Sequence, residues 1–492
     1  MSSPNSLLCF TNCLLPQEDG SLIQKDLWVD QAAGTILDAQ KTFYLSRERP
    51  TEIIDLGGNI LSPGLLDIQL NGAYGFDFSI YEGDDQKYRD GLHLIAQNIV
   101  ETGVTSILPT VITQEKTLYP KLLDLLKPYT APKCATLLGW HAEGPFLQIA
   151  KRGAHAPPFL LTAPSAFKTF EDVYGAANLA DKEDWLMGCT SDTTSGVRMI
   201  TAAPELDGVM DAISEVTKRG VVFSIGHSIA STDIAAAAVC NGASLITHLF
   251  NAMPQLHHRD PSIIGLLGAS SSFSYANFGT STPTSGAFSS GGAPALSRTT
   301  SKGSLYKATS EAFDDVATPL GSPVLRPQAE TVVGTGKEER EFKRPFYGLI
   351  VDGIHIHPNS VRLAYSAYPE GCVLVTDAMK ILDPKLKDGI HEWRDGKNFV
   401  KEGDKLYLEG TDTLAGSAVT LDKCIRNFVQ FTGCTLGEAL KCATYNPAKC
   451  LGIEGKKGTL RAGADADLTV LSKEGRVLGT WVGGRRAWEV EA

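Results

Sequence analysis

The chain has 492 residues, of which 43% are hydrophobic and 21% charged, and it carries a formal net charge of −11 at pH 7. This length exceeds one ordinary domain but fits a large barrel with insertions and a small accessory domain. The acidic balance, which no basic cluster offsets, argues against a nucleic-acid-binding surface.

The cysteines and the N-terminal stretch predict a cytoplasmic protein. The ten cysteines are scattered without a C-x-x-C pair, which argues against a disulfide framework and against a cysteine zinc site. An apolar patch from Leu7 to Leu15 is interrupted by Asn12 and follows no basic region, so we expect no signal peptide. No uninterrupted run approaches the roughly 20 apolar residues of a membrane span, so we expect no membrane association.

The two ends of the chain share a β pattern. Residues 6–61 contain short apolar runs separated by turns, and the C-terminal stretch KGTLRAGADADLTVLSKEGRVLGTWVGGRRAWEV has the same character with Gly and Asp turns. The pattern predicts a small β-sandwich domain of residues 1–61 and 455–492, built from both chain termini.

The middle of the chain, residues 62–454, alternates between apolar runs and helical patterns. Runs that are apolar throughout suit strands buried on both faces, as in parallel sheets covered by helices. The predicted strands lie near 65–71, 106–112, 136–142, 198–204, 221–227, 245–250, 347–354 and 373–377. The predicted helices include 88–103, 204–220, 231–242, 418–431 and the segment GEALKCATYN. Eight strands alternating with helices predict a (β/α)8 TIM-type barrel of the α/β class.

One segment interrupts this alternation between the sixth and seventh strands. Residues 269–343 are rich in Ser, Thr, Gly and Pro, and the first part of the segment has almost no charge and few large aliphatic residues. Such a composition cannot bury enough apolar surface to offset the entropy of ordering. We therefore expect a disordered insertion without a catalytic role.

Polar residues that can perform chemistry end four of the apolar runs: Glu143, His227, His248 and Asp377. A (β/α)8 barrel builds its active site from the C-terminal ends of different strands. One Glu and two His can hold a divalent ion such as zinc and leave one position for water. Asp377 can then accept a proton from the attacking water and deliver it to a leaving amine. No H-E-x-x-H helix is present, which disfavours a metalloprotease of that type.

A fifth candidate, His355, closes the seventh run in the segment DGIHIHP. We expect it to donate a hydrogen bond to a substrate or to a developing oxyanion. His357 lies two residues further on; one of the two is expected to be structural, and we favour His355 for function.

Several motifs together give the chain a specific resemblance. In order along the chain these are PGLLDIQLNGAYGFDFS, HAEGPFL, KRGAH, GHS, THLFNAMPQLHHRDPSIIG, DGIHIHP, LVTDAM and LAGSAVTL. Over roughly 60–268 and 345–470 the chain resembles the N-acetylglucosamine-6-phosphate deacetylases of the amidohydrolase superfamily. The resemblance implies a metal-dependent hydrolase of amino-sugar catabolism that converts N-acetyl-D-glucosamine 6-phosphate to D-glucosamine 6-phosphate and acetate.

The resemblance also implies roles for individual residues. Glu143, His227 and His248 match the metal ligands of the family, and Asp377 matches the catalytic acid/base, with His355 near the scissile amide. The positions that match substrate contacts are Ala154, His155, Asn251, Ala252, Arg259, His355, Leu414, Ala415 and Gly416.

Arg259, in the segment HHRDP, matches the phosphate-binding arginine of the family. In this family that arginine can reach the site of the neighbouring subunit, so the resemblance implies a homodimer. A planar guanidinium also suits bidentate binding of phosphate oxygens. Without the resemblance, a solvated surface arginine would be the better interpretation.

The first strand departs from the wider superfamily, in which many members carry H-x-H to hold a second metal. Gln69 and Asn71 stand at these positions, and neutral amides are poor zinc ligands compared with imidazole. We therefore expect one divalent ion per subunit, zinc first, with Fe, Co and Mn as alternatives, as in relatives that also carry Q-x-N.

Two other functions stay open at this point. Another amidohydrolase, such as a cyclic-amide hydrolase or an N-acyl-amino-acid deacylase, would more often need a two-metal centre with H-x-H and a carboxylated lysine. A non-catalytic barrel that binds a phosphosugar or serves as a scaffold would be expected to have lost a ligand or the aspartate, and the sequence retains all four.

Overall fold

The computed structural model describes residues 6–179, 196–270, 342–392, 398–403, 405–411 and 416–491. Of the insertion expected at 269–343, residues 271–341 lie outside these ranges. The described residues belong to one compact unit of the chain.

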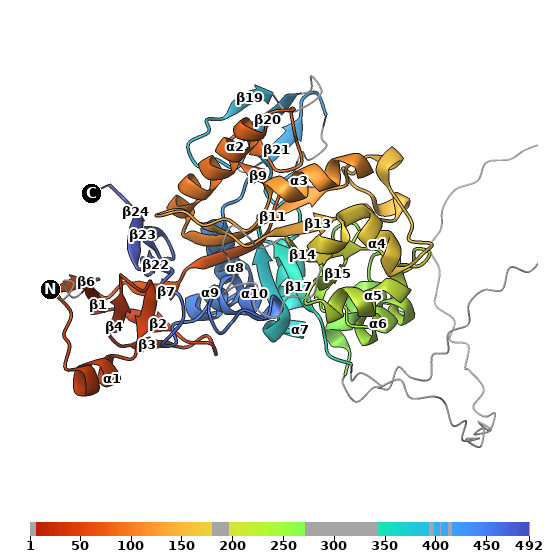
Figure 1. Cartoon of the computed structure of the whole chain (residues 1–492). Coiled ribbons are helices and arrows are strands. Elements are labelled where there is room, and N and C mark those ends of the chain that lie inside the picture. Colours follow the sequence, from red (N-terminus) through yellow and green to blue (C-terminus); the bar gives the residue numbers. More distant parts are fainter. Residues whose placement is uncertain are drawn as a thin grey trace, which may run out of the picture. The chain divides into compact units, whose positions relative to one another are not determined.

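A barrel of eight parallel strands forms the centre of this unit (Figure 1). The strands are β8 (Leu65–Leu70), β11 (Val104–Ile112), β13 (Trp140–Glu143), β14 (Val197–Ala202), β15 (Val222–Ile225), β16 (Leu245–Ile246), β17 (Phe346–Ile350) and β18 (Cys372–Val375). β8 pairs with β11, and each following strand pairs with the next as far as β18. The predicted (β/α)8 barrel is confirmed.

Two strands are shorter than the apolar pattern predicts, and in both the backbone geometry explains the difference. The third run, predicted over 136–142, splits into β12 (Thr136–Leu137) and β13 because Gly139 between them has φ of +108°. The sixth run, predicted over 245–250, is a strand only at Leu245–Ile246, because His248 turns the chain with φ of +26°. An apolar run in the sequence indicates buried residues, and residues stay buried beyond the point where the extended backbone ends. The predicted strands were therefore too long.

Helices follow the strands around the barrel (Figure 1). They are α2 (Asp85–Asn98), α3 (Tyr119–Leu125), α4 (Phe167–Tyr174), α5 (Val209–Lys218), α6 (Thr232–Cys240), α7 (Pro358–Ala367), α8 (Leu421–Thr432), α9 (Leu436–Ala443) and α10 (Tyr445–Cys450). Their pattern is amphipathic: α5 buries residues at spacings of three and four, namely Val209, Ala212, Ile213 and Val216. α2 starts where the side chain of Asp84 accepts hydrogen bonds from two backbone N–H groups of the first turn.

Strands from both chain ends form two further sheets beside the barrel (Figure 1). One sheet has the order β5-β4-β1-β6 and the other β24-β23-β22-β7-β2-β3. The N-terminal strands are β1 (Leu7–Thr11), β2 (Leu14–Pro16), β3 (Leu22–Gln24), β4 (Leu27–Asp30), β5 (Thr35–Leu37), β6 (Glu52–Asp55) and β7 (Ile60–Pro63). The C-terminal strands are β22 (Leu468–Leu471), β23 (Val477–Val482) and β24 (Arg485–Glu489), and a short helix, α1 (Ala39–Lys41), follows β5.

The core of these sheets mixes residues from the two chain ends. Phe10 packs edge-on against Trp481 with ring centroids 5.3 Å apart, and Leu61 and Leu468 are buried in the same cluster. Antiparallel pairing of β7 with β22 joins the two ends directly. The predicted β-sandwich built from both termini is therefore confirmed.

Short sheets not predicted from the sequence extend from the barrel. β9 (Gly72–Ala73) pairs with β10 (Phe76–Asp77) directly after the first barrel strand. After the last one, β19 (Gly389–Glu392), β20 (Asn398–Glu402) and β21 (Lys405–Leu408) form an antiparallel sheet. Both follow C-terminal strand ends, which is the side of a barrel that carries function.

The surface and the helices give two general results. Among the described residues, no helix is both long and apolar enough to cross a membrane.

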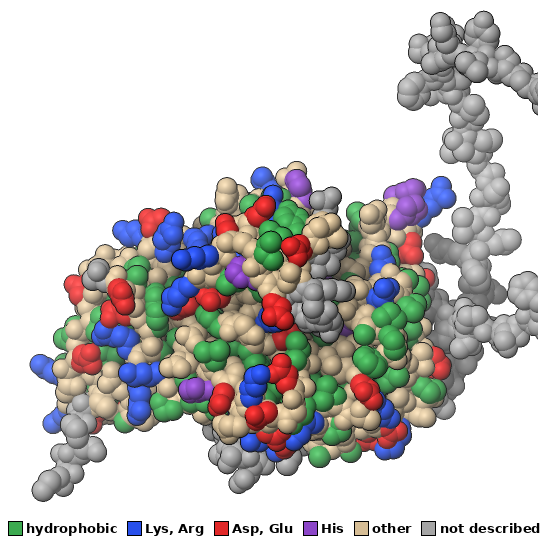
Figure 2. Space-filling model, turned by 90° about the horizontal axis from the view of Figure 1, so that it is seen from above, with side chains coloured by type: hydrophobic (Ala, Val, Ile, Leu, Met, Phe, Trp, Pro, Cys, Tyr) green, Lys and Arg blue, Asp and Glu red, His purple; other side chains and the backbone are tan. Residues whose placement is uncertain are grey.

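On the face seen in Figure 2, acidic and basic side chains are interspersed with apolar ones, so neither sign of charge dominates that face. Mixed charge of this kind gives little long-range attraction for one class of charged partner.

Candidate active site

Four residues predicted from strand ends occupy corresponding positions around the barrel. Glu143 is the last residue of β13, and His227, His248 and Asp377 each lie two residues beyond the end of their strand. The last three have positive φ, of 48°, 26° and 46° respectively. This conformation costs a non-glycine residue of order 1–3 kcal/mol and is found mainly at functional sites. The chain therefore turns sharply at these positions.

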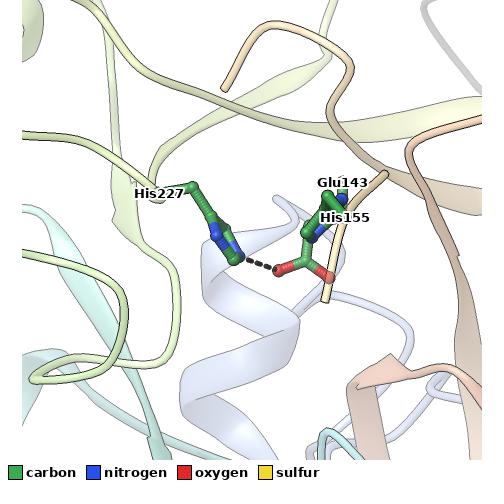
Figure 3. Close-up of side chains that lie close together, drawn as sticks. All are labelled: Glu143, His155 and His227. Atoms are coloured by element: carbon green, nitrogen blue, oxygen red, sulfur yellow. Dashed lines mark hydrogen bonds and ion pairs between the residues drawn. The ribbon is translucent and has the colours of Figure 1, made fainter. Parts of the chain in front are cut away.

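Glu143, His227 and His248 meet through their polar atoms. Oε1 of Glu143 lies 3.1 Å from Nε2 of His227 and 3.1 Å from Nε2 of His248, and the two Nε2 atoms are also 3.1 Å apart. All three residues are buried. Figure 3 shows His227 and Glu143 pointing toward each other from separate segments. We call these three residues the Glu143 cluster.

Hydrogen bonds at the other ring nitrogens decide what the Nε2 atoms can do. Nδ1 of His227 donates to the backbone carbonyl of Lys151 at 2.7 Å, which leaves Nε2 with a lone pair in the neutral ring. Histidines that bind metals commonly make such a bond to a carbonyl. Nδ1 of His248 is buried without a hydrogen-bond partner among the described residues. Nδ1 of His248 can therefore carry the ring proton, which leaves Nε2 with a lone pair that faces Glu143 and His227.

His155 lies in the same group but is arranged differently. Glu143, His155 and His227 have potential ligand atoms within 4.8 Å of one another, and the three are drawn together in Figure 3. Nδ1 of His155, however, accepts a hydrogen bond of 3.1 Å from the backbone N–H of Thr113. In the neutral ring the proton is then on Nε2, which makes that atom a donor rather than a ligand. His155 is therefore better suited to a substrate oxygen than to a cation.

The donor set of the Glu143 cluster fits a divalent cation. Burial alone would raise the pKa of Glu143, but the hydrogen bonds and charges of His227 and His248 outweigh it and hold that pKa well below its ordinary value. Two imidazole nitrogens and one carboxylate oxygen are the donors that zinc takes, at about 2.0–2.2 Å each. Donors around one tetrahedral ion at such distances lie about 3.4 Å apart, close to the separations found here.

Asp377 lies beside this cluster and is hydrogen-bonded to Asn71, the residue that follows the first barrel strand. Nδ2 of Asn71 donates to Oδ1 of Asp377 at 2.7 Å, and the backbone N–H of Asp377 donates to the carbonyl of Gln69 at 2.8 Å. Burial, together with the negative charge of Glu143, raises the pKa of Asp377 to about 6. A carboxyl group with a pKa near neutrality can both accept and return a proton.

The amides of the first strand thus contact carboxylates. While Asn71 holds Asp377, Nε2 of Gln69 donates to Oε1 of Glu143 at 3.4 Å. The sequence pattern had indicated only that these amides are poor ligands.

His355 lies beyond β17 and pairs with a neighbouring carboxylate. Its Nδ1 lies 2.5 Å from Oδ2 of Asp352. Burial alone would lower the pKa of His355, but the bond to Asp352 and the charges of Asp352 and Asp377 outweigh it and raise that pKa. His357 is exposed and instead accepts a hydrogen bond from the N–H of Asn359 at the start of α7.

The remaining predicted residues occupy the loops that follow the strands. Asn251 and Ala252 lie three and four residues after His248. The N–H of Ser228 donates to the carbonyl of Ala252, which joins two of these loops. Ala154 is exposed. Gly416, with φ of +101°, lies against Met379 in the segment that follows Asp377. Leu414 and Ala415 lie outside the described residues.

Arg259 is an exposed residue of the loop after β16. Its backbone N–H donates to Nδ1 of His257 at 3.3 Å. Within the described part of the chain, no hydrogen bond or ion pair joins its guanidinium to the Glu143 cluster. The structure of one chain therefore does not bring Arg259 together with the other predicted residues.

Several contacts of the site were missed from the sequence. Asp352 could have been found, because a carboxylate three residues before His355 follows the same apolar run. The carbonyl of Lys151 and the N–H of Thr113 are backbone groups, and no side-chain pattern reports them. Asn71 was considered only as a ligand and not as a hydrogen-bond donor.

The fold is an eight-stranded parallel barrel, and its strand ends carry a carboxylate, two imidazoles and a facing aspartate. This arrangement is found in barrel hydrolases that act through a bound metal. The family model described as "Amidohydrolase family" matches residues 60–487. The chain belongs to the amidohydrolase family.

Several relatives that are similar over nearly the whole chain share one name. The N-acetylglucosamine-6-phosphate deacetylase of Caenorhabditis elegans is 36% identical over 98% of this chain and 95% of its own length. That of Homo sapiens is 36% identical over 99% of this chain and 97% of its own. A solved structure of a variant of the Mycobacterium smegmatis N-acetyl-D-glucosamine-6-phosphate deacetylase, in complex with N-acetyl-D-glucosamine-6-phosphate, has a TM-score of 0.65. It is 22% identical over 98% of both chains, so it shows the same fold.

Proposed function

We propose that the chain hydrolyses the acetamido group of N-acetyl-D-glucosamine 6-phosphate, giving D-glucosamine 6-phosphate and acetate in amino-sugar catabolism. The observation that carries the proposal is the convergence of Glu143, His227 and His248 beside Asp377, in a chain whose full-length relatives are named for this reaction.

Glu143, His227 and His248 would hold one divalent ion, and zinc is the first candidate because it takes imidazole nitrogen and carboxylate oxygen. When bound, such an ion lowers the pKa of water and polarises a carbonyl group. The bond from His227 to the carbonyl of Lys151 fixes the ring orientation that this role needs. Gln69 and Asn71 supply hydrogen bonds and not further ligands, which favours a single ion.

Asp377 carries the proton through the reaction. It accepts a proton from the attacking water while the water oxygen adds to the amide carbonyl carbon. It then gives this proton to the amide nitrogen, the C–N bond breaks, and acetate and the free amine remain. Its pKa of about 6 leaves most of the carboxyl ionised at pH 7, so the group starts as a base.

His355 and His155 would contact the substrate. The pairing of His355 with Asp352 favours the protonated ring, which would donate a hydrogen bond to the carbonyl oxygen as negative charge develops there. Nε2 of His155 would donate to a sugar or phosphate oxygen. Backbone and side chains of Ala154, Asn251, Ala252 and the 414–416 stretch would complete the sugar pocket.

We further propose that the chain acts as a homodimer, in which Arg259 binds the phosphate group in the site of the neighbouring subunit. This fits its exposed position and its lack of contact with the Glu143 cluster of the same chain. We also propose a cytoplasmic location, because the cysteines that the structure describes are free thiols, as is usual in reducing compartments.

The test is acetate release from N-acetylglucosamine 6-phosphate and from unphosphorylated N-acetylglucosamine, with metal analysis of the same sample. We expect release from the phosphorylated sugar and about one divalent ion per chain. Asp377→Asn should lower turnover about 10²–10⁴-fold and leave the metal content unchanged. Asp383→Asn, six residues further along the chain, serves as the control and should stay active. No acetate from the phosphorylated sugar, or full turnover in Asp377→Asn, would reject the proposal.

A further inference from the structure

The seam between the last and first barrel strands differs from the other seams. β18 pairs with β17 in register, and β8 pairs with β11. Among the described residues, no ladder joins β18 to β8, and an isolated bridge between Leu70 and Ala378 marks the seam. The backbone hydrogen bonds across the seam lie at the C-terminal ends of the two strands. The N–H of Asp377 donates to the carbonyl of Gln69, and the N–H of Asn71 donates to the carbonyl of Ala378, each at 2.8 Å.

Two residues before Gln69 in β8, Asp67 binds Thr376, the residue just before Asp377. Oγ1 of Thr376 lies 2.6 Å from Oδ2 of Asp67, and the backbone N–H of Thr376 donates to Oδ1 of Asp67 at 3.4 Å. The N–H of Gln69 donates to the same Oδ1 at 3.2 Å. One carboxyl group thus holds both the side chain and the backbone of Thr376 and also its own strand.

Asp67 is costly to keep in this position. Its side chain is fully buried, at 0% exposure, and within the described ranges no Lys, Arg or His pairs with it. Burial raises the pKa of Asp67 to about 7, although the hydrogen bonds from Thr376 and Gln69 oppose the shift. A buried carboxyl group without a cation is unfavourable, so its retention needs a local reason.

The reason lies one residue further on. Asp377 has φ of +46°, a conformation that L-residues avoid and that persists only where the surroundings hold it. A regular ladder would continue the extended backbone of β18 through this position. β18 instead ends at Val375, Thr376 contacts Asp67, and Asp377 accepts the hydrogen bond from Asn71 beside the Glu143 cluster.

We infer that Asp67 is a positioning residue of the proposed reaction: by holding Thr376 across the barrel seam, it sets the direction in which Asp377 presents its carboxylate. The inference rests on the proposed function, since it concerns the group that moves the proton. Asp67 does not itself contact the Glu143 cluster in the hydrogen bonds described above.

The principal test is Thr376→Val, which keeps the shape of the side chain and removes its hydroxyl. We expect kcat to fall about 10- to 100-fold, because small misplacements of a reacting group have effects of this size. KM for N-acetylglucosamine 6-phosphate and the metal content should stay at the wild-type values, since binding and the Glu143 cluster are untouched. Thr376→Ser, which restores the hydroxyl, should recover most of the lost kcat.

Thr444→Val is the matched control. Thr444 is also buried and lies between α9 and α10. Its Oγ1 donates to the carbonyl of Leu440 at 2.7 Å. It should lose thermal stability comparable to that of Thr376→Val and keep wild-type kcat. This pair separates a general loss of packing from a loss of orientation.

Three results would overturn the inference: unchanged kcat in Thr376→Val, a fall in kcat that comes with loss of metal or a matching rise in KM, or no recovery in Thr376→Ser. If Thr376→Val does not fold, Asp67→Asn takes its place and must show the same fall in kcat at constant KM and metal content. A wild-type chain that releases no acetate would reject the proposed function itself, whereas an active wild type with an equally active Thr376→Val rejects only the role of Asp67.

Discussion

Asn71, the residue after the first barrel strand, donates a hydrogen bond of 2.7 Å to Oδ1 of Asp377, which follows the last strand. The bond crosses the seam of the barrel and fixes the carboxylate next to the Glu143 cluster. An amide at this position supplies a donor to the carboxylate, where an imidazole could supply a ligand to a second ion. The amides after and within the first strand therefore fit the single ion proposed above.

This bond predicts a change in the pH dependence of turnover. The hydrogen bond from Asn71 stabilises the charged form of Asp377 and so lowers its pKa. In Asn71→Leu the pKa of Asp377 should rise, by about one to two units for a bond to a charged acceptor. Because the ionised carboxyl is the proposed base, the acid limb of kcat should move to higher pH, and activity should fall more at pH 6 than at pH 8. Steady-state rates across this range measure the shift.

The control for that experiment is Asn446→Leu. Asn446 is also buried, and its Nδ2 donates to the carbonyl of Cys372 at 2.7 Å, at the opposite end of β18 from Asp377. It should lose stability without moving the acid limb. An acid limb that stays in place in Asn71→Leu would contradict the proposed link between the two residues.

A second prediction distinguishes the roles of His248 and His155, which both lie near Glu143. His248→Gln should lose most of the bound metal, because it removes one of three converging donors. His155→Gln should keep the metal and raise KM, because Nδ1 of His155 is an acceptor for Thr113 and its proton lies on Nε2. Metal analysis by mass spectrometry, together with KM, decides between them. Metal loss in His155→Gln with retention in His248→Gln would reverse the assignment.

A third prediction concerns the phosphate group. Arg259→Ala should raise KM for the phosphorylated sugar much more than for the unphosphorylated one, since charge-assisted bonds to phosphate are lost. Arg219→Ala, which removes a guanidinium just after the end of α5 that pairs with Glu215, is a suitable control. Equal effects on both sugars would argue against a phosphate contact.

Mixing Arg259→Ala with Asp377→Asn chains adds a test of the dimer: a rise in activity above either variant alone would require a site completed by the partner subunit.

A fourth prediction concerns the stability of the terminal β sheets. Nζ of Lys457 lies 2.6 Å from Oδ2 of Asp467 and 2.9 Å from Oδ2 of Asp465, and Lys457 and Asp467 are buried. Lys457→Met leaves the Asp467 carboxylate buried without its cation, which should cost about 3–5 kcal/mol of unfolding free energy. Lys218→Met, in an exposed pair with Glu215, should cost no more than about 1 kcal/mol. Urea unfolding of both variants measures the difference, and similar costs would contradict the prediction.

Much of the barrel could be predicted from the sequence, because an apolar run reports burial and a polar residue at its end reports where the strand stops. This is why Glu143, His227, His248 and Asp377 could be chosen before any distance was known. The same signal overestimated the sixth strand, since it does not report φ, and His248 has already left the extended conformation.

Only the tertiary structure decided how the strand ends meet. The 3.1 Å separations in the Glu143 cluster join residues up to 105 positions apart, and the bond from Asn71 to Asp377 spans 306 positions. The contacts that assign ring protons, to the carbonyl of Lys151 and from the N–H of Thr113, involve backbone groups that every residue possesses. Residue type along the chain determines burial and local chemistry, whereas closure of the barrel determines which of those polar groups lie within hydrogen-bonding distance of one another.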